Sequence, residues 1–550
     1  MNIGEMQRKL SLWATQDKER KFYDLYDLML TKDWIRLAHD HVAQNAGSVT
    51  AGCDGIDMEI FDKKLEENLQ QLIQDLKSKT FEPQPVRRVY IPKANGKVRP
   101  LGIPAIRDRI VQEAARMILE PIFEADFSRY SFGFRPNRRT MDAVRYIQWS
   151  MSERKKFFWI IEGDISSYFD TIHHPKLLRL LGRRIEDKKM LRLIWKFLRA
   201  GVMEKRTFKD TKLGTPQGGV ISPLLANIYL HELDRSMERY TALTQTEKAK
   251  RRRNRAGNFT YARYADDFVV LCNGGKEQAE KMREELYTFL GQTLRLELSK
   301  EKTKISHAND GFTFLGFFIR RELGNRGVMT VKVTIPNTAM KRLQSNLKQS
   351  LARDQDSVVG KIRGINRILR GWCQYYQYTS QAGVQFHELD HFLFWEMAHW
   401  IGRKFKIHMP AIMQKYVIDN TFVYEGNRLI MAKEFKAKSY HQTFLKPNPY
   451  LMVERKLERE ELPQEDQWVA YESRPGRADL RLQTLTRDNY TCRGCGKAVT
   501  AETADVDHIR PVRRFKRPVD ADTLGNLQTL CIPCHAAKTK TDHYAESRMR

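Results

Sequence analysis

The sequence has few of the features that mark secreted or membrane-spanning proteins. It contains only seven cysteines in 550 residues, and Cys53, Cys272 and Cys373 are scattered, so no disulfide framework is expected. Its apolar runs fall short of the roughly 18 residues that a membrane-spanning helix needs. Its amino terminus mixes acidic with basic residues, which suits neither a signal peptide nor a transit peptide. We therefore expect a cytosolic protein with no membrane partner.

Acidic residues are also in deficit. The chain has 67 Asp and Glu against 95 Lys and Arg, a formal net charge of +28. A surplus of this size predicts a polyanionic partner such as nucleic acid, with a basic protein of solvated charged faces as the alternative. At about 150 residues per domain, the chain is long enough for three or four domains.

Adjacent carboxylates at Asp266 and Asp267 are the feature around which the sequence is organised. They lie between two β-rich runs, a pattern typical of a hairpin with an acidic tip. A third carboxylate, Asp164, follows the apolar run 157–161, which is typical of a buried strand. Neighbouring carboxylates repel one another unless a cation neutralises them, and three can hold two metal ions about 4 Å apart. A solvated turn is the alternative for the adjacent pair.

Seven short motifs occur along the chain in a fixed order. They are IPK with KVRPLGIP at 91–104, SFGFRP at 131–136, GDI with FD at 163–170, GTPQGG at 214–219, YADD at 264–267, LS with KT at 298–303, and FLGF at 314–317. The series resembles the reverse transcriptases encoded by bacterial group II introns, and the resemblance covers nearly the whole chain. It implies an α+β right-hand polymerase with fingers, an antiparallel palm sheet and a helical thumb bundle.

The resemblance also assigns roles to individual residues. It implies that Asp164, Asp266 and Asp267 are catalytic and bind two Mg²⁺ ions. Four residues are candidates for contacts to the incoming dNTP: Lys93, Arg99, Phe169 and Gln217. The two cations would contact the triphosphate, and the ring of Phe169 would lie beneath the sugar and reject a 2′-hydroxyl. The alternatives are solvated hairpin charges and a core phenylalanine.

Helical patterns follow the polymerase motifs. Strand signals end near Gly316, and apolar residues then recur at helical spacing in three stretches between Leu343 and Trp400. The block 367–376 resembles the thumb, or maturase domain, of the same proteins, which grips intron RNA. Within the palm, the basic run 248–255 predicts an exposed RNA-binding insertion, with a solvated linker as the alternative.

The carboxyl-terminal stretch carries a second group of chemically active residues. Two cysteine pairs with two-residue spacing suit a tetrahedral zinc site: Cys492, Cys495, Cys531 and Cys534. Asp507, His508, Asn526 and His535 occur in an order that resembles an HNH endonuclease. The resemblance implies that His508 is the general base, Asp507 and His535 hold one divalent metal, for which we expect Mg²⁺, and Asn526 orients the loop. A DNA-binding zinc knuckle is the alternative.

These features divide the chain into five predicted segments. They are an N-terminal helical extension (1–80), fingers and palm (81–330), a thumb or maturase domain (331–430), a basic DNA-binding segment and linker (431–475), and a small ββα-type zinc-containing HNH domain (476–550).

The predicted protein is a multifunctional group II intron-encoded protein. It would be an RNA-directed DNA polymerase, a maturase that assists intron splicing, and a site-directed DNA endonuclease for target-primed intron mobility, or retrohoming. Its partners would be intron RNA, target DNA and dNTPs, and it would act in the bacterial cytoplasm as a nucleoid-associated ribonucleoprotein. One alternative is a maturase without polymerase activity, which the intact aspartates argue against. Another is a reverse transcriptase of a diversity-generating or defence system, which the nuclease tail disfavours.

Overall fold

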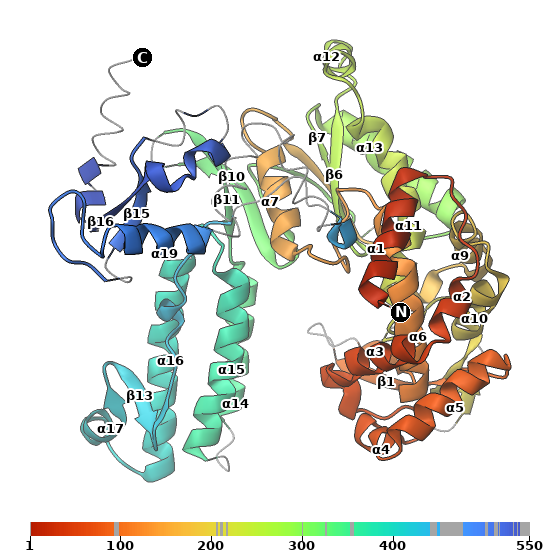
Figure 1. The fold of residues 1–550 in the computed structure, drawn as a ribbon, viewed down its shortest axis with the longest axis horizontal. Helices are drawn as coiled ribbons and strands as arrows, with labels where there is room; N and C mark the ends of the chain where they lie inside the picture. Colours follow the sequence, from red (N-terminus) through yellow and green to blue (C-terminus); the bar gives the residue numbers. More distant parts are fainter. Residues whose placement is uncertain are drawn as a thin grey trace. The chain divides into compact units, whose positions relative to one another are not determined.

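The chain forms two compact units in a computed structural model, Met1–Leu451 and Met452–Arg550 (Figure 1). The structure describes residues 2–92, 98–204, 207–209, 213–215, 218–299, 301–324, 327–352, 357–440, 448–451, 477–500, 504–510, 515, 518–531, 533–535 and 537–538. No helix in these ranges combines the length and hydrophobicity that crossing a bilayer requires.

Helices open the first unit and pack on a long buried helix. They are α1 (Ile3–Gln16), α2 (Leu25–Met29), α3 (Lys32–Ala43), α4 (Met58–Asp62) and α5 (Leu65–Lys77). α1, α2 and α3 all contact α6 (Ile106–Glu124). The fully buried Trp34 of α3 donates its indole N–H to the carbonyl of Ala114 at 3.1 Å, which satisfies its polar atom inside the core.

The fingers contain a four-stranded sheet in the order β2-β1-β4-β5. Its strands are β1 (Val86–Pro92), β2 (Val98–Ile103), β4 (Val202–Glu204) and β5 (Thr207–Lys209). β1 and β2 are antiparallel, with Ile91 opposite Arg99. β4 pairs with β1 in parallel, so residues more than 100 positions apart in the chain meet in this sheet.

The palm sheet has the order β6-β7-β3-β8, and every neighbouring pair is antiparallel. Its strands are β3 (Trp159–Gly163), β6 (Phe259–Tyr264), β7 (Asp267–Cys272) and β8 (Ile305–His307). Successive residues of a strand point to opposite faces, and Ile160 and Ile161 belong to two different buried apolar clusters. Both faces of the sheet are therefore covered, which explains why β3 begins with three apolar residues, Trp159, Ile160 and Ile161. The antiparallel palm sheet that was predicted is confirmed.

Different helices cover the two faces of this sheet. α11 (Ser222–Thr241) and α13 (Lys276–Thr288) share the cluster of Ile161, whereas α7 (Thr140–Ser150) shares the cluster of Ile160. The other helices of the region are α8 (Tyr168–Thr171), α9 (His174–Leu181), α10 (Lys188–Arg199) and α12 (Gln245–Arg253). α12 has no buried residue and projects from the palm (Figure 1).

A three-helix bundle follows, as the three apolar stripes predicted. Its helices are α14 (Asn337–Leu351), α15 (Val358–Tyr376) and α16 (Ala382–Phe405). The expectation that strands end near Gly316 is wrong. Among the described residues of this unit, five strands and a helix follow Gly316: β10 (Phe317–Leu323), β11 (Met329–Thr334), α17 (Met409–Tyr416), β12 (Val417–Ile418), β13 (Thr421–Tyr424) and β14 (Asn427–Arg428). β9 (Phe312–Phe314) lies just before this glycine. Phe314 of β9 pairs with Phe317 of β10, so Leu315 and Gly316, both with positive φ, form the two-residue turn between two strands of one sheet.

The second unit is built on one antiparallel strand pair. β15 (Ala504–His508) pairs with β16 (Leu527–Cys531), and α19 (Arg477–Arg487) contacts both strands. An isolated bridge between Thr491 and Ala498 closes the loop that carries the first two cysteines of the predicted zinc site.

Candidate active sites

The register of the palm sheet brings the predicted carboxylates to one end of the sheet. β3 pairs with β7 so that Gly163 lies opposite Phe268, and Asp164 follows one residue later. Because the strands are antiparallel, the next position across from Asp164 is Asp267, the first residue of β7. These two aspartates therefore lie next to each other where β3 leaves the sheet.

A two-residue turn places Asp266 beside this pair. Tyr264 of β6 pairs with Asp267 of β7, which leaves Ala265 and Asp266 as the tip of the hairpin. Ala265 has a φ of 58°, in the left-handed region that tight hairpin turns use. The hairpin expected from the sequence forms, with Asp266 in its turn and Asp267 as the first residue of β7.

Burial and mutual repulsion raise the pKa values of two of the three aspartates. Burial raises the pKa of Asp266, and the charge of Asp164 raises it further. Loss of surrounding water, followed by the charges of Asp266 and Asp164, raises the pKa of Asp267 to about 6, although part of this side chain reaches solvent. Lys302 and Arg99 oppose that shift, and Nζ of Lys302 lies 2.9 Å from Oδ2 of Asp164.

This donor set suits a hard divalent cation. Such cations prefer carboxylate oxygens, and a bound metal would relieve the repulsion that raises the two pKa values. The oxygens of the three aspartates do not all lie within 4.8 Å of one another, so the side chains would draw together around an ion. The residues present therefore fit the predicted magnesium ions.

Two of the four predicted nucleotide contacts can be located. Arg99 is exposed on β2 and close enough to the aspartates to lower the pKa of both Asp266 and Asp267. Phe169, on α8, is half-buried, and its ring centroid lies 6.4 Å from that of Phe134 in an edge-on contact. Lys93 and Gln217 lie outside the described residues.

The glycine-rich motif that begins at Gly214 packs against both the fingers and α8. The amide of Thr215 donates to the carbonyl of Phe169 at 2.7 Å. A Cβ at Gly218 would lie 2.4 Å from the carbonyl oxygen of Gly102 on β2, so only glycine allows this approach. Three motifs that are distant in sequence therefore meet around Phe169.

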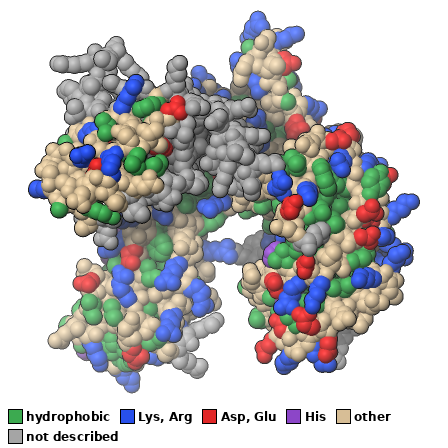
Figure 2. Space-filling view, viewed as in Figure 1, with side chains coloured by type: hydrophobic (Ala, Val, Ile, Leu, Met, Phe, Trp, Pro, Cys, Tyr) green, Lys and Arg blue, Asp and Glu red, His purple; other side chains and the backbone are tan. Residues whose placement is uncertain are grey.

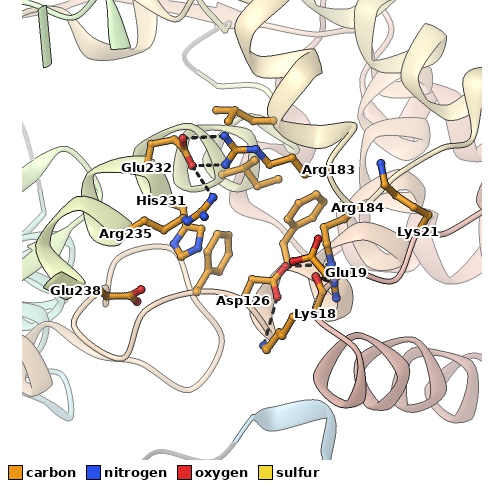
Figure 3. Close-up of a pocket in the computed structure, with 14 residues that line it drawn as sticks. Lys18, Glu19, Lys21, Asp126, Arg183, Arg184, His231, Glu232, Arg235 and Glu238 are labelled. Atoms are coloured by element: carbon orange, nitrogen blue, oxygen red, sulfur yellow. Dashed lines mark hydrogen bonds and ion pairs between the residues drawn. The ribbon is translucent and has the colours of Figure 1, made fainter. Parts of the chain in front are cut away.

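A cavity of about 690 Å³ lies beside α11, and none of the predicted site residues lines it (Figure 3). Its wall carries both acidic and basic side chains, and several already form ion pairs with each other. Arg183 pairs with Glu232 at 2.5 Å, and Arg184 with Asp126 at 3.2 Å. These charges are neutralised within the wall, so the cavity does not present a surplus of one sign to a ligand.

In the second unit, β15 carries two carboxylates on one face. Asp505 and Asp507 are two residues apart on the strand and so point to the same side. His535 lies against them: its Nδ1 is 3.0 Å from Asp505, and its Nε2 is 3.9 Å from Asp507. Lys538 places its ammonium 2.9 Å from Asp507. The predicted ligands Asp507 and His535 are therefore brought together.

His508 follows Asp507 on β15, so its side chain points to the opposite face of the strand pair. It is 5% exposed, and its Nε2 lies 2.9 Å from Oδ1 of Asp522. Asn526 holds the loop that follows His508: its side chain accepts from the amide of Arg510 at 2.9 Å and donates to the carbonyl of Ala521 at 2.9 Å. These bonds tie the segment after His508 to Ala521, and the loop-orienting role of Asn526 stays a prediction.

The four predicted zinc ligands converge. The sulfur atoms of Cys492, Cys495, Cys531 and Cys534 lie within 4.8 Å of one another, and they form the one such cluster found among the residues that can be placed. Burial alone would raise the pKa of Cys492, but hydrogen bonds from the backbone amides of Cys531, Cys495 and Gly494 lower it to about 6. An ionised thiol among three others fits a four-coordinate Zn²⁺.

Comparison with known proteins connects these sites. Residues 91–319 match the family model "Reverse transcriptase (RNA-dependent DNA polymerase)", residues 340–417 match "Group II intron, maturase-specific domain", and residues 492–541 match "HNH endonuclease". The group II intron-encoded protein LtrA of Lactococcus lactis subsp. cremoris is 34% identical over 458 residues, which cover 70% of this chain and 75% of LtrA. The chain belongs to the group II intron-encoded proteins.

Two other similarities accompany this one. Protein YkfC of Escherichia coli (strain K12) is 42% identical over 395 residues, which cover 68% of this chain and 100% of YkfC. Among solved structures, the "Partial Cas6-RT-Cas1--Cas2 complex" matches 48% of this chain and 42% of its own at 24% identity, with a TM-score of 0.30. That score is too low to support an argument about this fold.

This group II intron-encoded protein thus combines a reverse transcriptase, a maturase domain and an HNH endonuclease in one chain. It is an RNA-directed DNA polymerase with a nuclease domain, and the predictions of family, fold class and multifunctional activity are confirmed. The maturase match excludes the alternative of a non-intron reverse transcriptase. Divalent metals serve both enzyme families in general, and the maturase and HNH domains imply contacts to intron RNA and to DNA.

The sequence did not single out three of the side chains at these sites. Asp505 had a signal, since it lies two residues before Asp507 in an apolar-flanked strand and must share its face. Asp522 and Lys538 had no sequence signal, because only the folded structure brings their segments next to His508 and Asp507.

Proposed function

We propose that this protein copies its intron RNA into DNA at the palm carboxylates, aids splicing of that intron through its thumb, and cuts target DNA to make the primer. The observation that carries the polymerase assignment is the register of β3 and β7, which brings Asp164 to the Asp266–Asp267 turn. Three neighbouring carboxylates, with the exposed Lys302 and Arg99 beside them, form a site for cations and for the phosphates that cations bring.

At the polymerase site, Asp164, Asp266 and Asp267 bind two Mg²⁺ ions. The three carboxylates would hold the ions, which would supply activation of the attacking 3′-hydroxyl and charge stabilisation for the leaving pyrophosphate. Lys93 and Arg99 contact the triphosphate with charge-assisted hydrogen bonds. Gln217 forms a hydrogen bond with the nucleotide. Phe169 excludes a 2′-hydroxyl by its bulk.

At the nuclease site, Asp507 and His535 hold one divalent cation, for which Mg²⁺ is our candidate. Asp505 lies 3.0 Å from Nδ1 of His535 and orients the ring as an outer partner of this ligand. His508 removes a proton from the attacking water, and Asp522, whose Oδ1 lies 2.9 Å from Nε2 of His508, stabilises the protonated ring. The cysteine cluster holds a structural Zn²⁺.

The finer assignments of partner and place follow from these roles. We infer that the intron RNA contacts the basic faces of the thumb, and that target DNA contacts the segment 431–475 and the HNH domain, residues 476–550. The fingers and palm comprise 81–330, the thumb 331–430, and the N-terminal extension 1–80. A ribonucleoprotein of this kind works at the nucleoid in the bacterial cytoplasm.

Primer extension tests the polymerase assignment. Asp266→Ala should abolish dNTP incorporation on an RNA template, because removing one ligand leaves the metals insufficiently held. The same variant should bind intron RNA, support splicing at low Mg²⁺ and nick target DNA as the wild type does. Asp310→Ala, which removes an exposed aspartate from a turn, is the matched control and should extend normally. Extension by Asp266→Ala at the wild-type rate would refute the site.

A further inference from the structure

Arg263 lies directly beneath the tip of the catalytic hairpin and is completely buried. It occupies β6, three residues before Asp266. Its guanidinium donates to both carboxylate oxygens of Asp234, at 2.9 and 2.6 Å, to the amide oxygen of Asn227 at 2.9 Å, and to the carbonyl of Ala265 at 2.9 Å. All four acceptors are protein atoms, so the cation is solvated by the fold alone.

The partner carboxylate is equally removed from water. Asp234, on α11, is 0% exposed; burial would raise its pKa, but Arg263 holds it well below its usual range. A buried ion pair stabilises a fold weakly, because the cost of removing two charges from water offsets their attraction. General stability therefore gives little reason for this pair, and its geometry indicates a local task.

That task concerns the peptide between Ala265 and Asp266. Ala265 adopts a left-handed conformation, which costs an L-residue roughly 1–2 kcal/mol and persists only when its surroundings hold it. Arg263 binds the carbonyl of this residue, and that carbonyl belongs to the peptide group that leads into Asp266. The direction of the Asp266 side chain is therefore coupled to the position of the guanidinium.

The same network reaches the opposite side of the turn. Asn227 accepts from Arg263 and donates its amide N–H to the carbonyl of Gly133 at 2.8 Å. Gly133 itself packs directly against the turn, since a Cβ at this position would lie 2.3 Å from the backbone nitrogen of Ala265. One residue earlier, the amide of Phe132 donates to the carbonyl of Arg263 at 2.8 Å. The turn is thus held from below by Arg263 and from the side by Gly133, and Asn227 joins the two supports.

We propose that Arg263, oriented by Asp234 and Asn227, is a positioning residue for polymerisation: it sets the Ala265–Asp266 peptide and thereby the spacing between Asp266 and Asp164. It contacts no reacting group and acts through the carbonyl of Ala265. The proposal rests on the assignment of Asp266 as a metal ligand and adds the structure that keeps it in place.

Asn227→Ala is the sharpest test, because it leaves the Arg263–Asp234 pair intact and removes only the link between the two supports. Displacement of a reacting centre by about 1 Å can cost about 10²-fold in rate. We expect kcat to fall ten- to a hundredfold, with KM for dNTP changed less than about threefold. Mn²⁺ alone, titrated into the protein and followed by electron paramagnetic resonance, should bind several-fold more weakly. Intron RNA binding and splicing at low Mg²⁺ should be unchanged.

Tyr229→Phe is the matched control. It also removes a buried polar group from α11, the Tyr229 hydroxyl that donates to the carbonyl of Leu294 at 2.7 Å, but it does not touch the turn. Its melting temperature should fall, while its kcat and Mn²⁺ affinity stay at wild-type values. If the two variants share the same kcat and Mn²⁺ affinity, the proposal is wrong.

Arg263→Lys provides a second variant. Lysine keeps the charge opposite Asp234, so the protein should still fold. Because one nitrogen cannot reach all four acceptors, kcat should fall as in Asn227→Ala. Wild-type kcat in a folded Arg263→Lys protein would overturn the proposal. Failure of the underlying assignment looks different: Asp266→Ala would then extend primers normally, whatever Asn227→Ala does.

Discussion

The ammonium nitrogen of Lys302 lies 2.9 Å from Oδ2 of Asp164, the carboxylate at the exit of β3. The nuclease site repeats this relationship, with Lys538 at 2.9 Å from Asp507. In each site a lysine neutralises a carboxylate that we expect to bind a divalent metal. Because both charges are partly exposed, each lysine can turn away into solvent when a metal takes its place.

Lys302→Met should shift the pH dependence of metal binding at the polymerase site to higher pH. The pKa of Asp267 is raised to about 6, so this carboxyl is protonated below that pH, and metal affinity should fall as the pH drops through 6. Lys302 lowers this pKa, and its removal should shift the midpoint of the fall upward. Mn²⁺ titrations between pH 5 and 8 measure it. Lys304→Met, which removes an exposed lysine two residues away, should leave the midpoint unchanged; an unchanged midpoint in Lys302→Met would count against the prediction.

Gly133→Ala should destabilise the palm and reduce polymerisation together. The added Cβ would lie 2.3 Å from the nitrogen of Ala265 and 2.8 Å from the carbonyl carbon of Tyr264, and backbone atoms cannot step aside as side chains can. Overpacking of this kind costs about 1–3 kcal/mol. The free energy of unfolding from urea titration and the rate of primer extension provide the measurement.

Gly371→Ala is the control for this substitution. Gly371 lies within α15, and nothing is within 4 Å of the position its Cβ would take. Alanine favours a helix over glycine by up to about 1 kcal/mol, so this variant should be as stable as the wild type or slightly more so. A Gly133→Ala protein as stable as Gly371→Ala would show that the turn is not under pressure from this side.

Much of the polymerase site could be predicted because its signals are local. A continuous apolar run, an acidic hairpin tip and a third carboxylate at a strand exit are all visible in short stretches. The pairing of Arg263 with Asp234 could not be predicted, since an arginine inside a strand looks like an exposed charge until the helix that carries its partner is packed beneath it. The strands after Gly316 were missed for a similar reason: β10 is the central strand of its sheet, yet Arg320, Arg321 and Glu322 follow one another in its second half and hide the alternating pattern.

Phe169→Ala should raise the incorporation of ribonucleotides relative to dNTPs. The ring is half-buried and held edge-on by Phe134 and by Tyr168, at 6.4 and 5.4 Å between centroids, so it cannot easily turn aside from a 2′-hydroxyl. Phe169→Tyr keeps the bulk and should keep the discrimination. The ratio of kcat/KM for the two nucleotide types is the quantity to compare, because loss of packing lowers both rates alike. An equal ratio in wild type and Phe169→Ala would return this residue to a purely structural role.

The insertion helix α12 should contact RNA. Arg252, Arg253 and Arg255 are exposed, whereas Arg251 folds back and donates to the carbonyls of Gly257 and Ala256, which anchors the base of the helix. Figure 2 shows Lys and Arg side chains gathered at the end of this projection. Each phosphate contact releases counterions, so binding that uses these arginines should weaken steeply with salt.

Replacing Arg252, Arg253 and Arg255 by glutamine should weaken intron RNA binding and reduce the slope of log K against log salt by up to about 2–3. The control removes three cations from α13 that each lie beside a glutamate: Lys276, Lys281 and Arg283. Because those charges are already paired, their loss should change the slope less. Equal slopes in the two triple variants would mean that α12 is only a solvated helix.

The two metal roles of the second unit should separate by mutation. Cys531→Ser removes one of four converging sulfurs, and because a closed zinc site contributes folding energy, this variant should lose its zinc, unfold the unit and lose nicking as a consequence. Cys53→Ser, at a cysteine outside the cluster, should keep its zinc. Atomic absorption gives the zinc content of each protein.

His508→Ala and Asp505→Asn should leave the zinc in place and still impair nicking. Removal of a general base costs on the order of 10² to 10⁴-fold in rate, so His508→Ala should fail to nick target DNA in Mg²⁺ while extending a supplied primer normally. Asp505→Asn removes the carboxylate that orients the ring of His535, and loss of such an outer partner costs about 10- to 100-fold. A smaller loss in Asp505→Asn than in His508→Ala is therefore expected. If either variant loses zinc together with nicking, its residue supports the fold instead of the chemistry; if either nicks at the wild-type rate, its assigned role in cleavage is wrong.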